Sequence, residues 1–262
     1  MKHKFGFLTD VDNPLLPYFL YEARRAGVTN IFVICDSLRT KQKDIAIWEH
    51  RTNGQFCALD GTKISMAEID VRFGCRTPYF MVESHNSSNF LLLCKELGLT
   101  CLFNAGTPRK LNSEVLSATP IGVLNVHPGV LPKYRGASAV EWALLNEDRV
   151  GNTAHFMDEG YDTGPIITVE SYDLKPPFEY SDIRKMVYQR GCVLAAKVLS
   201  NISAGKLRAA DAIGQELDLG QQWPPMPLDK FNKMLDMLAL ADDLYSKFSN
   251  PNSGPQDMDQ SQ

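Results

Sequence analysis

The sequence lacks any apolar stretch long enough to cross a membrane, which would need about 18 residues or more. Its apolar N-terminal run extends only from Phe5 to Leu8, too short for the core of a signal peptide. No pair among its six cysteines is spaced as C-x-x-C, and Cys35, Cys94 and Cys101 lie in apolar runs. This favours buried thiols over a disulfide framework or a zinc site. We therefore expect a cytoplasmic protein with reduced cysteines, no metal and no membrane contact.

The sequence also lacks an excess of basic residues. Its 262 residues include 27 Lys and Arg against 31 Asp and Glu, a net charge of −4. This balance argues against a broadly basic face that grips nucleic acid, although it allows a local basic patch. The hydrophobic fraction of 44% and charged fraction of 22% are those of a globular protein. The length suits one large domain, or one domain with a modest appendage.

Several motifs of common enzymes are missing. There is no G-x-x-x-x-G-K-[ST], and the first predicted strand is followed by T-D-V-D-N-P rather than by G-x-G-x-x-G. That loop lacks the glycines that let a backbone approach a pyrophosphate. G-x-S-x-G and H-E-x-x-H are absent too, so nothing supports a serine hydrolase or a zinc protease of the usual kinds.

Short apolar runs alternate with helical patterns through most of the chain. The apolar runs predict the following strands: 5–9, 30–35, 79–82, 100–104, 123–126, 153–157 and 166–169. Helices are predicted between them, at 14–26, 41–51, 87–97, 112–119 and 139–146. The alternation predicts an α/β fold with a mainly parallel sheet and helices on both faces.

The pattern changes after a predicted helix at 181–203, which ends before Gly205. We therefore expect a catalytic domain over 1–205 and a small C-terminal extension over 206–248. The extension contains an amphipathic helix, Leu228 to Phe248, whose apolar face docks on the body or on a second subunit. The polar residues 249–262 are expected to be a disordered tail.

The informative segment begins where the strand at 123–126 ends. Asn125 and His127 are two residues apart, so in an extended chain their side chains project to the same face. Ligands bind beyond the carboxyl ends of strands in open α/β sheets. Asp162 lies in a later loop between Gly160 and Gly164 and could reach His127, where its charge would raise the pKa of the imidazole. Each of these features also has a purely structural interpretation: Asn-x-His could end a strand, and Asp162 could be a turn residue.

The joint occurrence of these residues resembles the signature of the 10-formyltetrahydrofolate-dependent formyltransferase family. The motifs that carry the resemblance are N-V-H-P at 125–128, L-P-K-Y-R-G at 131–136, T-A-H at 153–155 and D-T-G-P-I at 162–166. The resemblance is dense over about 102–167 and weak before Pro78. It implies a Rossmann-like fold, 10-formyltetrahydrofolate as co-substrate and direct transfer of a formyl group to a primary amine.

The resemblance also implies roles for individual residues. Asn125, His127 and Asp162 match the catalytic triad of the family. Two loops resemble those that bind the folate, and the residues concerned are Gly106, Thr107, Pro108, Arg109, Leu111, Asp158, Gly160 and Tyr161. His85, Asn86 and Tyr134 are weaker candidates for substrate contacts, with loop capping as the alternative for the first two. His155 is either part of the T-x-H motif or a packed strand residue.

The acceptor amine stays open at this point. The Y-R-G ending and the C-terminal extension look most like sugar-nucleotide N-formyltransferases, which modify an amino sugar on a nucleoside diphosphate and often form homodimers. Methionyl-tRNA formyltransferases resemble the core but usually have a larger C-terminal domain, and tRNA binding calls for a basic surface. Glycinamide ribonucleotide transformylases usually carry an early Gly-rich phosphate loop, which is missing here. An amino acid or peptide amine is a further alternative, and a folate-binding protein without catalysis is the non-enzyme alternative.

Overall fold

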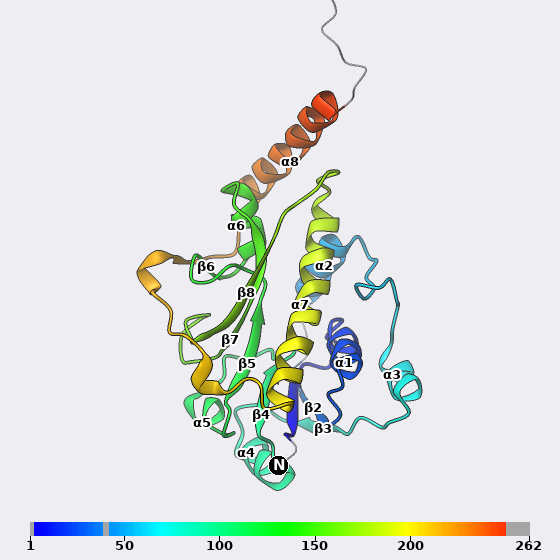
Figure 1. Cartoon of the computed structure of the whole chain (residues 1–262), viewed down its shortest axis with the longest axis vertical. Helices are drawn as coiled ribbons and strands as arrows, with labels where there is room; N and C mark the ends of the chain where they lie inside the picture. Colours follow the sequence, from blue (N-terminus) through cyan, green and yellow to red (C-terminus); the bar gives the residue numbers. More distant parts are fainter. Residues whose placement is uncertain (1–2, 39–41, 250–262) are drawn as a thin grey trace, which may run out of the picture.

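A computed structural model of the chain describes residues 3–38 and 42–249, and within them a seven-stranded sheet forms the centre (Figure 1). In the order of the sheet the strands are β3 (Tyr79–Val82), β2 (Ile31–Asp36), β1 (Phe5–Thr9), β4 (Cys101–Asn104), β5 (Val123–His127), β7 (Val150–Phe156) and β8 (Ile166–Tyr172). The strands from β3 to β5 in this order pair in parallel, whereas β5–β7 and β7–β8 pair antiparallel. The predicted α/β fold with a mainly parallel sheet is confirmed.

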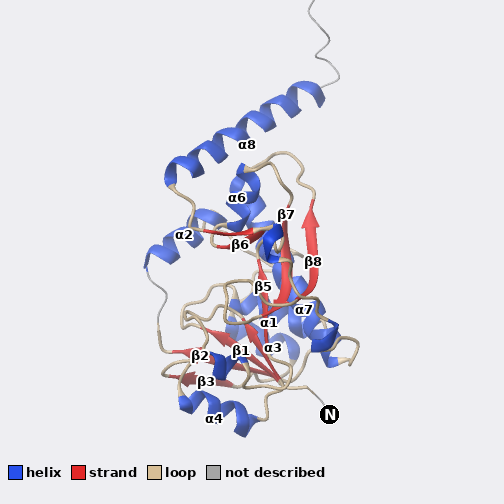
Figure 2. Cartoon of the chain, turned by 90° about the vertical axis from the view of Figure 1, so that its left-hand side faces the viewer, coloured by secondary structure: helices blue, strands red, loops and turns tan. Residues whose placement is uncertain are grey.

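Helices cover both faces of this sheet (Figures 1 and 2). One face packs against α1 (Leu16–Arg25), α3 (Met66–Phe73) and α7 (Tyr180–Ser203). The other face packs against α4 (Ser88–Leu97) and α5 (Ser113–Leu116). The remaining helices are α2 (Gln42–Thr52), α6 (Ala139–Leu145) and α8 (Leu228–Ser249). No helix in the described part of the chain has the length and apolar character needed to span a membrane.

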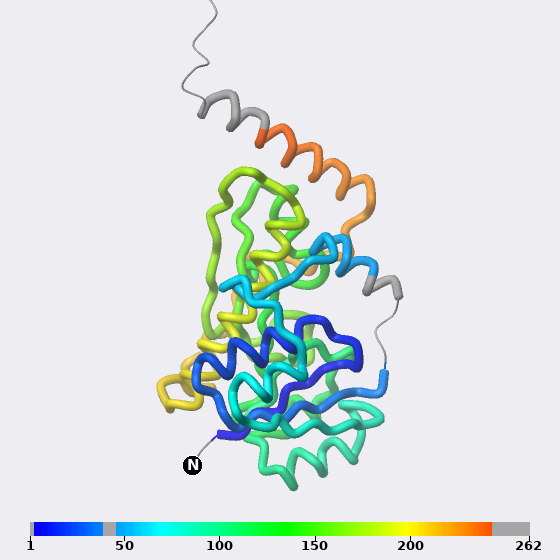
Figure 3. The backbone as a smooth tube through the Cα atoms, turned by 90° about the vertical axis from the view of Figure 1, so that its right-hand side faces the viewer, coloured from blue at the N-terminus to red at the C-terminus, as the bar shows by residue number. Residues whose placement is uncertain are grey.

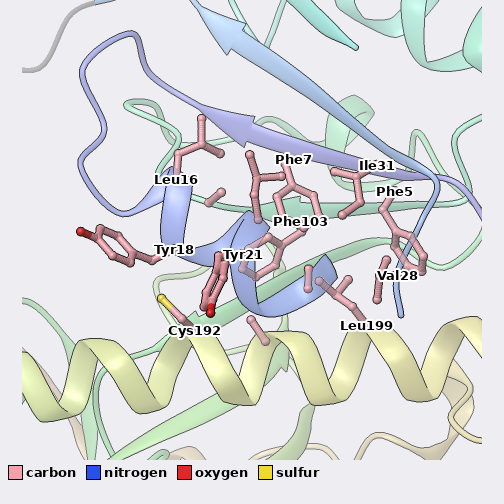
Figure 4. Close-up of a cluster of buried hydrophobic side chains, with 14 of the residues drawn as sticks. Phe5, Phe7, Leu16, Tyr18, Tyr21, Val28, Ile31, Phe103, Cys192 and Leu199 are labelled. Atoms are coloured by element: carbon pink, nitrogen blue, oxygen red, sulfur yellow. The ribbon is translucent and has the colours of Figure 1, made fainter. Parts of the chain in front are cut away.

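The two faces follow from the alternation of side chains along each strand. In β1, Phe5 and Phe7 join the cluster under α1 and α7, while Leu8 points to the opposite cluster under α4 (Figure 4). In β4, Phe103 packs on the same face as Phe7, with the ring centroids 5.0 Å apart. Burying one such side chain contributes about 1.5–3 kcal/mol. The strands are apolar on both sides because both sides are covered.

The ends of three helices show which local sequence signals mark a helix boundary. The helix predicted at 87–97 is α4: Ser87 caps it by accepting a hydrogen bond from the Phe90 amide, and Gly98 ends it in the left-handed conformation. Asn112 caps α5, where a helix was predicted at 112–119, but the helix stops at Leu116 and does not reach Thr119. Sequence analysis missed α3, although Ser65 and Glu68 form a capping box at its start.

The chain after α7 is bonded to the body along its length. Strand β9 (Gln221–Trp223) pairs in parallel with β6 (Tyr134–Gly136), and Ile213 forms an isolated bridge with Ile166. The first half of helix α8 packs on the cluster around α6, at the end of the molecule opposite the N-terminus (Figures 2 and 3). Neither β6 nor β9 was predicted, because three-residue strands carry no periodic signal. The tail predicted at 249–262 lies, from residue 250 onward, outside the described residues.

Candidate active site

The candidate site lies at the carboxyl ends of β4 and β5, beside the loop that joins β7 to β8. Antiparallel pairing of β5 with β7 places Asn125 opposite His155. Asn104 ends the neighbouring strand β4, and Asp162 lies in the β7–β8 loop. Four polar side chains from distant parts of the sequence therefore meet at one edge of the sheet, where open α/β sheets bind their ligands.

A chain of hydrogen bonds sets the orientation of the Asn125 amide. The Asn104 oxygen accepts from the amides of Gly106 at 3.1 Å and Thr107 at 2.8 Å, so the Asn104 nitrogen must face Asn125 and donates to Oδ1 at 3.0 Å. The Asn125 nitrogen then donates to Nε2 of His155 at 3.0 Å. His155 completes the chain by donating from Nδ1 to the Phe156 carbonyl at 2.9 Å. One N–H of Asn125 is committed to His155, which leaves the second for a ligand.

His127 is almost completely buried, and its two nitrogens have different partners. Nε2 lies 2.7 Å from the Tyr134 carbonyl, which only accepts, so Nε2 carries a proton. Nδ1 faces Oδ2 of Asp162 at 3.3 Å. Burial lowers the pKa of His127, and the opposing effects of Asp162 and of the Tyr134 carbonyl do not overcome it. The charge of Asp162 thus acts on this pKa in the predicted direction, but desolvation outweighs it.

Asp162 bridges the two histidines. Its Oδ1 lies 3.6 Å from Nε2 of His155, and its Oδ2 accepts a hydrogen bond of 2.8 Å from the Gly136 amide. Burial raises the pKa of Asp162, but the charge of His127, the nearby His155 ring and the hydrogen bond from the Gly136 amide outweigh it and lower the pKa overall. The backbone of Asp162 is left-handed, with φ of 57°, a conformation that Asp tolerates better than most residues.

Close packing holds the two loops around His127 and Asp162. A Cβ on Gly129 would lie 2.7 Å from Nε2 of His127 and 2.8 Å from the Tyr134 carbonyl, so only glycine allows their hydrogen bond. Thr153 secures the same loop by donating to the Gly129 carbonyl at 2.7 Å. From the C-terminal extension, Gln215 donates to the carbonyls of Asp162 at 2.9 Å and Gly164 at 2.6 Å.

A cavity of about 320 Å³ opens beside Asn125, His155 and Asp162, and we call it the donor cavity. The residues predicted to bind folate that line it are Thr107, Pro108, Arg109, Leu111, Asp158, Gly160 and Tyr161. Gly106 lines the adjoining hollows. The two predicted folate loops thus face each other across one cavity, and Lys110 lies 4.9 Å from the centre of the Tyr161 ring. His127 is not part of the cavity lining and contacts Asp162, which is.

The first of these loops is anchored by a buried carboxylate. Asp36, fully buried at the end of β2, accepts hydrogen bonds from Nε of Arg109 at 2.7 Å and from the His85 amide at 2.9 Å. Burial raises the pKa of Asp36, but these hydrogen bonds outweigh it and lower the pKa. His85 donates from Nε2 to the Ile34 carbonyl at 3.0 Å, so its Nδ1 accepts from the Thr107 hydroxyl at 2.7 Å. The anchor therefore holds both Thr107 and Arg109.

The three weaker candidates lie outside the lining of the donor cavity. His85 is fully buried beneath the loop, and burial lowers its pKa. Asn86 donates to the Lys110 carbonyl at 2.9 Å and accepts from the Asn112 amide at 3.0 Å, which is loop capping. The ring of Tyr134 is buried against Trp223, and its hydroxyl donates to Asp148. The alternative of loop capping describes the contacts of His85 and Asn86 better than a substrate contact does.

Sequence reasoning assigned no role to two contributors to the site and left a third open. His155, either a motif residue or a packed strand residue by sequence, lies between Asn125 and Asp162. Asp36 directly follows the strand predicted at 30–35, and Gln215 lies in a segment without any periodic pattern. Within the described residues, no group of three or more His, Cys, Asp or Glu side chains is arranged to hold a metal ion.

Comparison with known proteins agrees with this geometry. A model of the family described as "Formyl transferase" matches residues 58–200, which is more than half of the sequence. The chain therefore belongs to the formyl transferase family. Among curated relatives, methionyl-tRNA formyltransferase of Clostridium acetobutylicum is 29% identical over 151 residues, which cover 56% of this chain and 49% of that protein. The chain thus spans about half the length of the curated relatives it matches.

Solved structures show the same fold at low sequence identity. Glycinamide ribonucleotide transformylase 1 from Symbiobacterium toebii aligns with a TM-score of 0.57 and 19% identity, over 82% of this chain and 95% of that one. A sugar N-formyltransferase from a Shewanella species aligns with a TM-score of 0.56 and 14% identity, over 84% of this chain and 76% of that one. These likenesses establish the Rossmann-like architecture of the family.

Proposed function

We propose that this protein transfers a formyl group from 10-formyltetrahydrofolate to a primary amine. The observation that carries the proposal is the joint position of Asn125, His155 and Asp162 on the wall of the donor cavity. The volume of this cavity, about 320 Å³, falls within the range of about 300–1,000 Å³ that is usual for small-molecule sites. The family model adds independent support for formyl transfer.

The residues of the chain have distinct roles in this proposal. Loops 106–111 and 158–161 would hold the folate, which supplies an activated formyl carbon. The free N–H of Asn125 donates to the oxyanion that develops as the amine attacks, and the bond to His155 keeps that N–H in place. His155 and Asn104 are positioning residues for Asn125 in this scheme.

Proton transfer falls to Asp162 and His127. Burial lowers the pKa of His127, so its Nδ1 is unprotonated near pH 7 and can accept a proton. A proton leaving the amine nitrogen passes to Oδ2 of Asp162 and then over 3.3 Å to Nδ1 of His127. The resulting imidazolium lies next to a carboxylate, and the two charges stabilise each other. Collapse of the oxyanion then breaks the bond between the formyl carbon and N10 of the folate, and N10 takes the proton back through Asp162 as tetrahydrofolate leaves. His127 thus acts through Asp162 and does not touch the oxyanion itself.

For the acceptor, we propose an amino sugar carried on a nucleoside diphosphate. The sugar N-formyltransferase of Shewanella shares the fold, and the acidic charge balance does not favour a nucleic acid. The second candidate is an aminoacyl-tRNA, because the curated relatives are methionyl-tRNA formyltransferases. An amino acid or peptide amine is a third.

We further propose that the protein works in the cytoplasm as a homodimer. The six cysteines are free thiols, which suits a reducing compartment. Leu240 on α8 is 60% exposed beside an apolar hollow formed with Leu174 and Phe178, a face that a second copy would cover. Sedimentation equilibrium of the wild type and Leu240→Lys checks this, and a wild type that is monomeric at micromolar concentration contradicts it.

Mass spectrometry tests the transfer itself. The protein is incubated with 10-formyltetrahydrofolate and pooled amino-sugar nucleotides, amino acids and aminoacyl-tRNA, and products heavier by one CO are sought. We expect one class of amine to be formylated, with equal formation of tetrahydrofolate. Folate binding without transfer to any amine would instead support the non-catalytic alternative.

A further inference from the structure

A second hollow lies on the other side of Asn125 from the donor cavity. A small cavity of about 180 Å³ shares Asn104 and Asn125 with the donor cavity. A larger one of about 490 Å³ shares Asn13, Gly106 and Tyr188 with the small one. The three hollows therefore adjoin one another around Asn125 and Gly106. We call the small and large cavities together the acceptor trough.

Two guanidinium groups share one carboxylate at the far end of the acceptor trough. Nε of Arg51 lies 3.2 Å from Oε1 of Glu141, and Nη1 of Arg184 lies 3.7 Å from Oε2 of the same carboxylate. Glu141 and Arg184 are buried, whereas the Arg51 side chain is 24% exposed and lines the trough. Arg51 is therefore the guanidinium of this group that an anionic ligand in the trough can reach.

The trough also offers an aromatic surface and a defined polarity. Trp48 lines it and packs against the rings of Phe56 and Tyr188, with centroid distances of 5.2 and 5.1 Å. Asp10 follows β1 and also lines the trough. Because this carboxylate repels anions, an anionic group is favoured beside Arg51 and disfavoured beside Asp10.

We propose that Arg51 binds an anionic group of the amine acceptor, and that Trp48 stacks against a planar ring of the same molecule. The acceptor class is then an amine joined to a phosphate or carboxylate and a planar ring, of which a nucleoside diphosphate derivative is the phosphate form. The inference rests on the proposed function, in that the amine approaches Asn125 from this trough. Arg51 and Trp48 are specificity-determining residues under this assignment.

Binding measurements test the site without any turnover. Titration calorimetry compares uridine diphosphate, uridine and methionine on the full chain. One of the anionic ligands, the diphosphate or the carboxylate, should bind the wild type. We expect Arg51→Gln to weaken the binding of that ligand by about tenfold to a hundredfold, the usual contribution of a charge-assisted hydrogen bond. Uridine, which has no charge, should bind equally to both proteins. Trp48→Leu should weaken uridine and uridine diphosphate alike.

Two further variants serve as a matched control and as a charge-conserving comparison. Arg149→Gln is the matched control, since Arg149 is 69% exposed and pairs with Asp173 on the surface, and it should change no affinity. Arg51→Lys keeps the charge and should bind between the wild type and Arg51→Gln. The melting temperature of each variant checks its folding. We expect Arg51→Gln to fold, because Glu141 and Arg184 remain as an ion pair. Anion binding that is unchanged in Arg51→Gln, or absent from the wild type, overturns the site.

Parallel formylation assays separate this inference from the proposed function. If Arg51 governs anion binding but no amine is formylated, the proposed function fails and the site remains. If an amine is formylated with the same KM by the wild type and by Arg51→Gln, the site fails and the function remains.

Discussion

The two sides of Asn125 handle charge in opposite ways. On the donor side, the buried carboxylate of Asp36 accepts hydrogen bonds from Arg109 and from the His85 amide, and the His85 ring accepts one from Thr107. On the acceptor side, Arg51 and Arg184 share the carboxylate of Glu141, and Asp10 lines the same trough. A side whose charges are paired within the protein is preformed for a ligand recognised by shape and hydrogen bonds. A side where a partly exposed guanidinium shares its carboxylate is suited to a ligand that places an anionic group beside that guanidinium.

The two sides also differ in where their residues come from. The donor loop lies within the part of the chain that carries the family motifs. The acceptor trough combines α2 and α7 with the loop after β1 and the residues just before α6. The following predictions test whether the donor side depends on its anchors as strongly as its hydrogen bonds indicate, and whether the centre belongs to both sides.

The largest effect is expected at the centre. Asn125→Ala removes the N–H that both sides share and should lower kcat by about 10²–10³, the usual cost of losing an oxyanion donor. Asp162→Ala should lower it to a similar extent. Steady-state kinetics at saturating donor and acceptor checks this, with Asn201→Ala on α7 as the control that keeps wild-type activity. A folded Asn125→Ala protein within tenfold of the wild-type kcat contradicts the proposed role.

A smaller loss should follow from releasing the donor anchor. Asp36→Asn weakens the hold on Arg109 and should reduce binding of 5-formyltetrahydrofolate by about tenfold and the free energy of unfolding by about 1.5–3 kcal/mol. Calorimetry and urea unfolding measure the two effects. Asp173→Asn, on the exposed surface, is the control. Unchanged folate affinity would show that the anchor does not support the loop.

A still smaller effect is expected from the C-terminal extension. Gln215→Ala removes two hydrogen bonds to the Asp162 loop, each worth about 1 kcal/mol, and should lower kcat about fivefold. The substrate KM values should stay near those of the wild type, because Gln215 touches neither cavity wall. Gln55→Ala is the control, and equal kcat for both variants would show that the loop holds Asp162 without this support.

The smallest effect is a dependence of stability on pH. The pKa values of His85 and His127 are lowered by burial, so the unfolded chain binds protons more readily than the native one. The free energy of unfolding should therefore fall as the pH decreases below the ordinary histidine pKa of about 6.5. Urea unfolding between about pH 7.5 and about pH 5.5 measures the slope, and His85→Gln should reduce it. A slope that is flat or reversed contradicts the buried neutral histidines.

Much of the donor side was predictable because its signals are local. Alternating or continuous apolar runs marked the strands, and Ser87, Gly98 and Asn112 marked helix ends through their caps. The N-x-H spacing placed Asn125 and His127 together at the end of β5. The assignment of catalytic roles to these residues stays a prediction that the variants above address.

The properties of the site that could not be predicted depend on contacts between segments distant in the sequence. The direction of the His127 pKa shift is set by desolvation, which depends on everything packed around the ring. Likewise, His85 became a support for Thr107 only because β2, β3 and the donor loop meet.

The sequence by itself determined the fold class and the family, because strand alternation, caps and a dense run of motifs are written in neighbouring residues. The tertiary structure alone decided which polar groups are hydrogen-bonded to each other and which charged groups share one partner. Those properties arise from burial and from contacts between residues as far apart in the sequence as Arg51 and Glu141, and no local sequence pattern predicts them. For that reason the sequence could indicate formyl transfer, while the acceptor trough became visible only in the folded chain.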